Sequence, residues 1–99
     1  MKKNKAEVAA VSLPAHLDLP AAAPLHEQLL GLRGAAVAID ASKVETLGGQ
    51  CLQVLLSAVV TWKADMQPLS FVSPSRGFEN GLQLLGLNVE RLSEQEMIA

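Results

Sequence analysis

The amino-acid sequence predicts an α/β domain, with a mixed β-sheet of about four to five strands and helices packed on it. The first observation behind this prediction is that short apolar runs alternate with longer segments whose apolar residues recur at helical spacing. The second is the length of 99 residues, which suits one domain with a modest core. The third is that 49% of the residues are hydrophobic but only 3% are aromatic, so the core must be aliphatic.

The N-terminal half predicts strands on either side of a first helix. Residues 7–13 have a strand pattern, and Pro14 places this strand at an edge because proline cannot donate a ladder hydrogen bond. Residues 16–18 are compatible with a brief second strand. A helix is expected over about residues 21–31, with prolines near its start and glycines at its end. Residues 35–39 form a short apolar run, which is typical of a buried central strand.

The longest helix is expected over about residues 49–66. Its predicted buried face consists of Leu52, Leu55, Leu56, Val59 and Met66. Its predicted outward face consists of Gln50, Gln53, Val54, Ser57, Thr61 and Asp65. Val54 is the isolated apolar residue on that face and is expected to contribute little to the core.

The remaining segments predict a strand, a short helix and a last strand. Residues 69–73 have a strand pattern. Ser73 is then expected as an N-cap and Pro74 as the first residue of a third helix, which closes at Gly86. Residues 89–92 are expected to form a last short strand.

The composition excludes several classes of function. A net charge of −2 without a stripe of arginine and lysine argues against a nucleic-acid partner. Residues 1–5 are expected to form a flexible basic tail before a single domain at residues 6–99. Cys51 is the only cysteine, so an intrachain disulfide is excluded and a reducing, cytoplasmic setting is expected. No signal peptide or membrane-spanning segment is expected.

The start of the long helix is the predicted functional centre. From Thr46 to Trp62 the chain carries no charge, and a helix whose outward face lacks charge commonly contacts another molecule there. A loop and a glycine pair lead into this helix, which can expose backbone N–H groups. Whether an anion or a nucleotide binds at the glycine pair stays open. The predicted partner-binding residues are Gly48, Gly49, Gln50, Gln53, Val54 and Ser57.

No set of residues predicts catalysis, so the chain is expected to be non-enzymatic and to need no metal or cofactor. Asp40 has no second carboxylate at ligand spacing and is expected to accept loop N–H groups in an Asx turn. His16 and His26 lie on separate elements and are expected at the surface. Cys51 is interpreted as a packed thiol rather than a redox sensor, and Trp62 as a cover for the core edge.

In the order of its elements and in several segments, the chain resembles the STAS domain family, named for sulfate transporters and anti-sigma-factor antagonists. The matching segments are residues 37–44, the leucines that follow them, residues 69–72 and the closing Gly86-Leu87. The size and the stretch ASKVETLGGQCLQVLLSA resemble the small chemotaxis-associated CheS-like members, which act alongside the histidine kinase CheA. This resemblance implies that the partner is a signalling protein, and a CheA-type histidine kinase is expected. By binding the kinase, the chain would modulate phosphoryl flow to response regulators.

Two alternatives stay open on the same resemblance: an anti-sigma-factor-antagonist-like regulator, and a regulatory STAS subunit of a membrane transport complex. The regulatory motif of the family, Asp-Ser-Ser-Gly-Leu, falls on residues 48–52, where only Leu52 is retained. Gln50 stands at the position of the phosphorylated serine, so the resemblance implies no phosphorylation there. Ser42 and Thr46 are the loop hydroxyls that could be modified, although turn bonding is the favoured interpretation for both.

Overall fold

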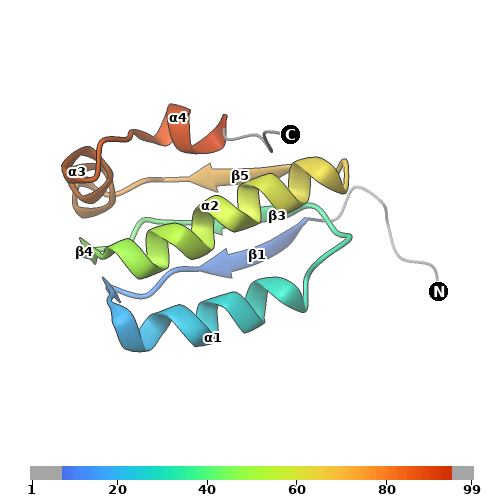
Figure 1. The fold of residues 1–99 in the computed structure, drawn as a ribbon, viewed down its shortest axis with the longest axis horizontal. Coiled ribbons are helices and arrows are strands. Elements are labelled where there is room, and N and C mark those ends of the chain that lie inside the picture. The colour runs from blue at the N-terminus through green and yellow to red at the C-terminus, as the bar shows by residue number, and fades with distance from the viewer. Residues whose placement is uncertain (1–7, 95–99) are drawn as a thin grey trace.

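The computed structural model describes residues 8–94, in which five strands and four helices follow one another (Figure 1). The strands are β1 (Ala9–Ser12), β2 (His16–Leu17), β3 (Val37–Asp40), β4 (Thr46–Leu47) and β5 (Leu69–Val72). The helices are α1 (Leu19–Leu30), α2 (Gly49–Ala64), α3 (Arg76–Leu84) and α4 (Val89–Ser93). The expected basic tail at residues 1–5 lies outside the described residues.

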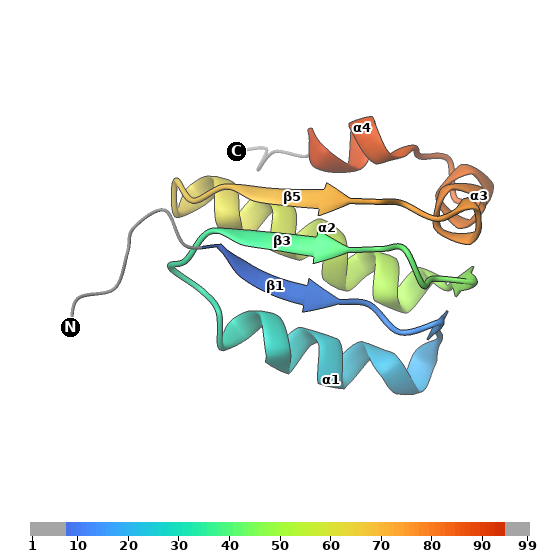
Figure 2. The ribbon, with the colours of Figure 1, turned by 180° about the vertical axis from the view of Figure 1, so that it is seen from behind.

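Three strands form a parallel sheet in which β3 lies between β1 and β5. Val11, Ile39 and Phe71 are register partners across this sheet. Helix α2 runs over one face of the sheet in Figure 1, and Figure 2 shows the opposite face without a described helix in front of it. Strands β2 and β4 pair with each other in a second, two-stranded parallel sheet.

The predicted α/β class, the edge position of β1 and the central position of β3 are confirmed. The strands of residues 8–94 differ from the single mixed sheet that the sequence suggested, because they form two sheets and every pairing is parallel. The separation begins at Pro14. Leu13 still donates its N–H to the Asp40 carbonyl at 3.0 Å, but Pro14 has no N–H with which to continue the ladder.

The core lies between the sheet and the helices and is built mainly of aliphatic side chains, as predicted. Ile39 of β3 and Leu55 of α2 are both fully buried. Leu56, expected on the buried face of α2, is only half-buried. Trp62 covers the core edge as expected, and its Nε1 donates to the Ala35 carbonyl at 2.7 Å. The buried residues of α2 are Cys51, Leu52, Leu55, Ala58, Val59 and Trp62.

Met66 does not belong to the buried face of α2, and this part of the prediction was wrong. The helix ends at Ala64, and the Met66 side chain is 87% exposed. Met66 has a φ of 57°, the left-handed conformation that commonly terminates a helix. The N–H of Gln67 donates to the Trp62 carbonyl at 3.0 Å, which satisfies one of the last carbonyls of the helix. Pro68 disfavours helical backbone at the residue before it and so stops the helix here.

Residues 89–92 form part of helix α4 and not the expected strand. The side chain of Asn88 accepts a hydrogen bond from the Arg91 N–H at 2.7 Å and thereby caps the helix. Val89 and Leu92, three residues apart, fall on the same side of this helix, and Leu92 is fully buried. The Asn88 cap is the signal that distinguishes a helix from a strand in this short segment.

The cap of α3 also lies two residues later than expected. Ser75, rather than Ser73, is the N-cap, and its Oγ accepts a hydrogen bond from the Phe78 N–H at 3.0 Å. Ser73 has a φ of 52°, so it turns the chain out of β5 instead of starting the helix. Gly86, with a φ of 85°, closes α3 as predicted.

A two-pronged ion pair joins the C-terminal ends of α1 and α2. Arg33 donates from Nε to Asp65 Oδ2 at 2.9 Å and from Nη2 to Oδ1 at 3.1 Å. These hydrogen bonds stabilise the charged form of both groups. They therefore lower the pKa of the Asp65 carboxyl and raise the pKa of the Arg33 guanidinium. The pair therefore holds the two helix ends together at neutral pH.

Leu55 tests the packing of α2 on the sheet. Leu55→Ala should lower the free energy of unfolding by about 2–5 kcal/mol, because it removes a fully buried side chain and leaves a cavity. Denaturant melts measure this loss. Leu84→Ala, at a site that is 88% exposed, is the control and should change stability by less than about 0.5 kcal/mol. A loss below about 1 kcal/mol for Leu55→Ala would contradict the assigned buried face.

The Arg33 and Asp65 pair should make stability depend on pH in the acid range. Because the pKa of Asp65 is lowered in the folded state, its contribution is present above the unfolded pKa of about 3.9 and is lost as pH falls through the folded value. The stability difference between wild type and Asp65→Asn should therefore shrink as pH falls below about 4. Urea melts from neutral to acid pH measure it. Arg33→Gln should behave alike, and a difference that is constant with pH for either variant would refute this account.

Candidate partner-binding site

The loop between β3 and α2 is held in place by backbone hydrogen bonds on one side. Asp40 Oδ1 accepts the Ser42 N–H at 2.9 Å, which confirms the predicted Asx turn, and this bond lowers the pKa of Asp40. The N–H of Glu45 donates to the Ala15 carbonyl at 2.7 Å. The N–H of Gly48 donates to the Leu17 carbonyl at 2.8 Å. The start of α2 is thereby tied to the segment that contains β2.

Helix α3 holds the same loop from another side. Ser75 Oγ donates to the Val44 carbonyl, and a Cβ at Gly77 would lie 2.5 Å from the Glu45 carbonyl oxygen. A Cβ at Gly81 would lie 2.7 Å from Leu47 Cβ. The two glycines, which lower the helix propensity of α3, are thus the residues that let it approach the loop.

The predicted partner-binding residues lie along the N-terminal half of α2 and the turn before it, with one difference in burial. Gly49, Gln50, Gln53 and Ser57 are exposed, and Gly48 is the partly exposed N-cap. Val54 is half-buried and packs against the core, so the expectation that it contributes little to the core was wrong. The reason is that helix α1 lies beside α2, which the periodicity of α2 alone cannot indicate.

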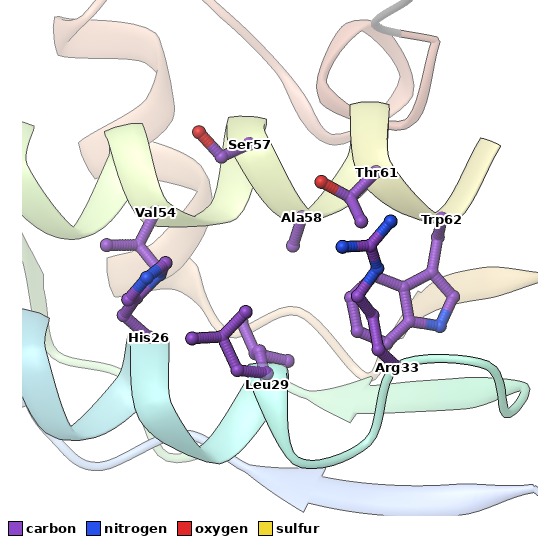
Figure 3. A pocket seen from close by; sticks show the side chains of 9 residues that line it. His26, Leu29, Arg33, Val54, Ser57, Ala58, Thr61 and Trp62 are labelled. Atoms are coloured by element: carbon purple, nitrogen blue, oxygen red, sulfur yellow. The ribbon is translucent and has the colours of Figure 1, made fainter. Parts of the chain in front are cut away.

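A groove between α1 and α2 extends this surface, and we call it the α1/α2 groove (Figure 3). Its volume of about 60 Å³ is well below the range of about 300–1,000 Å³ that is usual for small-molecule sites. A groove of this size accommodates a side chain of a partner protein. The residues that line it are His26, Leu29, Leu30, Arg33, Val54, Ser57, Ala58, Thr61 and Trp62.

The α1 half of the groove was missed by the sequence reasoning. Leu29 and Leu30 are consecutive, so only one of them can lie on the buried stripe of α1. Leu29 is 3% exposed, whereas Leu30 is 52% exposed and lies at the groove. The consecutive leucines were the available signal. On α2, buried Ala58 and Trp62 also line the groove.

The histidines and loop hydroxyls form no enclosed catalytic site. His16 and His26 are both exposed, as expected, and lie on β2 and α1. His16 Nδ1 lies 3.2 Å from Thr46 Oγ1, and its Nε2 lies 3.9 Å from Glu45 Oε1. Thr46 thus has a hydrogen-bond partner across the β2 and β4 pair, while the Ser42 side chain is exposed.

Cys51 is fully buried, which supports the packed-thiol interpretation. Its Sγ donates to the Asp18 carbonyl at 3.3 Å. Burial raises the pKa of the thiol, and the nearby Asp18 raises it further. A raised pKa keeps the thiol protonated and poorly reactive, which is the opposite of what a redox sensor requires.

Within residues 8–94 no group of three or more histidine, cysteine, aspartate and glutamate side chains is arranged to hold a metal ion. None of the helices in this part of the chain has the length and apolar character needed to span a membrane. What the site does offer is exposed polar side chains on α2 and an exposed leucine, Leu30, across the groove on α1.

Comparison with known proteins assigns the family. Residues 1–96 match a family model described as Mlab, STAS domain. No match was found among curated proteins or among solved structures. The match does not extend to the CheS-like subgroup, which stays a prediction from the sequence. Because the matched region covers nearly the whole chain and the fold agrees with it, the chain belongs to the STAS domain family.

Proposed function

We propose that this chain is a non-enzymatic interaction module that binds a signalling protein through α2 and the turn before it. The observation that carries the proposal is the exposed, uncharged stripe of Gln50, Gln53 and Ser57 beside the α1/α2 groove. Charged residues are depleted at the centres of protein interfaces, because burying an unpaired charge is costly. The stripe starts at a loop held on two sides, so little ordering would be needed on binding.

STAS domains are generally non-catalytic regulatory modules, and the site residues of this chain fit such a role. Gln50, Gln53 and Ser57 supply amides and a hydroxyl, which can form hydrogen bonds without changing charge. Neither histidine lies among these residues: His16 is on β2, and His26 faces the apolar groove. The arrangement suits recognition of a protein surface better than proton transfer.

The partner that we propose is a CheA-type histidine kinase, in keeping with the resemblance to the CheS-like proteins. Docking on the kinase would alter phosphoryl flow to its response regulators. The second candidate is a component of a membrane transport complex, since other stand-alone STAS proteins have that role. Both partners would use the same face of α2, so one set of variants serves for both.

Ser57→Glu is the variant that tests the docking surface. Ser57 is exposed and lines the groove, so a carboxylate there should leave folding within about 0.5 kcal/mol but should weaken partner binding roughly tenfold or more. Calorimetric titration against the CheA-type kinase of the same organism, and against the transport component, gives the affinity. Val54→Glu is less suitable because Val54 packs on the core.

Gln83→Glu, on the exposed surface of α3, is the matched control and should bind like wild type. Gln53→Lys provides a second change on α2 with the opposite charge. If Ser57→Glu and Gln53→Lys both bind a partner as tightly as wild type, α2 is not its docking surface. If the wild type binds only the transport component, the kinase assignment is wrong.

The presence of Gln50 at the family's phosphoserine position predicts that this chain is not phosphorylated there. The Gln50 amide cannot accept a phosphoryl group under protein-kinase chemistry, so the chain should remain unlabelled when a STAS-directed serine kinase and labelled ATP are added. Gln50→Ser, which places a hydroxyl at an exposed position of the first turn of α2, is the matched comparison. Mass spectrometry should detect phosphate only in that variant. Stable phosphate on Ser42 or Thr46 of the wild type would instead indicate a modification switch.

A further inference from the structure

The ionisable side chains that line the α1/α2 groove are both of the basic kind, namely His26 and Arg33. Figure 3 shows His26 toward the end of the groove near Val54, and the guanidinium of Arg33 toward the end near Thr61 and Trp62. No aspartate or glutamate is among the lining residues. The groove thus combines an apolar floor with a side chain that can donate hydrogen bonds at each of its two ends, the imidazole of His26 and the guanidinium of Arg33.

Arg33 retains donors that its internal ion pair does not use. A guanidinium carries five N–H groups, and Asp65 accepts from Nε and Nη2 of Arg33. The side chain of Arg33 is 53% exposed, whereas that of Asp65 is 24% exposed. Asp65 therefore fixes the orientation of the guanidinium and leaves its outer edge accessible from the groove. A pre-oriented guanidinium loses less side-chain entropy when it binds a second carboxylate.

We propose that the occupant of the α1/α2 groove is an amphipathic helix of the partner protein that inserts one aliphatic side chain and carries carboxylates beside it. The aliphatic side chain fits the volume of about 60 Å³ over Leu29, Ala58 and Trp62. One carboxylate accepts from the outer N–H groups of Arg33, and a second accepts from the imidazole of His26. A helix laid in an apolar groove with complementary charge at its edges is a recurring mode of peptide recognition.

This inference rests on the proposed function, since it specifies what docks beside α2. A basic or neutral partner segment would contradict it and leave the docking role of α2 intact. The two hypotheses therefore need different experiments. Ser57→Glu tests whether the face is used, and the charge of the bound segment tests the present inference.

A displayed library of helical peptides is the first experiment. Each peptide has an alanine-based helix with a central position randomised among apolar residues and flanking positions randomised among glutamate, lysine and glutamine. Selection on the immobilised full-length chain should enrich glutamate at the flanks and leucine, isoleucine or methionine at the centre. Equal recovery of the three flanking residues, enrichment of lysine, or no enrichment over the bare support would overturn the proposal.

A charge exchange then tests Arg33 directly. The double variant Arg33→Asp with Asp65→Arg keeps the two partners of an internal ion pair but moves the cation from position 33, which lines the groove, to position 65, which does not. The selected glutamate-flanked peptide should bind this variant at least tenfold more weakly, and the same peptide with lysine at its flanks should bind it better than wild type. Affinities are measured through the fluorescence of Trp62, the only tryptophan, which lies in the groove floor.

Unfolding midpoints of the double variant show whether its fold is retained. If it does not fold, Arg33→Gln serves instead, with the same tenfold weakening expected. Unchanged affinity for the glutamate-flanked peptide in a folded variant would refute the role of Arg33. Gln83→Glu on α3 is the control for a charge change away from the groove, and it should leave peptide affinity unchanged.

Discussion

Burial of the aliphatic side of α2 against the central strand is the interaction on which the rest of this structure depends. Leu55 of α2 and Ile39 of β3 are fully buried and belong to one core cluster. Once these side chains are buried, the rotation of α2 about its axis is fixed, and so is the set of residues that faces outward. The exposure of Gln53 and Ser57 is therefore a consequence of core packing, and the candidate site inherits the rigidity of the core.

The start of α2 is fixed by a different kind of contact. Its N-cap, Gly48, has no side chain to bond the first turn, but its N–H is bound by the Leu17 carbonyl. Close packing of α3 through Gly77 holds the preceding loop from another side. Backbone contacts of this type leave the side chains of the first turn available for other partners. Because the start of α2 is already ordered before a partner arrives, it loses less conformational entropy when the partner binds.

The α1/α2 groove shows how a small domain can build a recognition surface from two helices distant in the sequence. Leu29 and Ala58 form parts of its floor, and both also belong to the core. At one end, the Arg33 and Asp65 pair joins the two helices. The same guanidinium lines the groove, so one residue contributes both to helix packing and to the charge that a partner meets. This double use is consistent with a regulatory STAS domain that acts by binding.

The sequence alone determined the α/β class, the central strand, the long helix with its uncharged run up to Trp62 and the Asx turn at Asp40, because each depends on periodicity or on bonding within a few residues. It also indicated the buried thiol of Cys51, since one apolar face of a helix can be read from spacing. Short segments carry little periodic information. The segment of α4 was predicted as a strand because five residues do not establish a period, although the Asn88 cap was a usable signal.

Only the tertiary structure decided that α1 lies beside α2, that Val54 is half-buried and that Arg33 meets Asp65 across thirty-two positions of sequence. It also decided that the short strands β2 and β4 pair apart from the main sheet. Local patterns give the buried face of an element but carry no information on which neighbour covers its flanks. Those lateral contacts follow from the packing of the whole chain, and the groove is made of them.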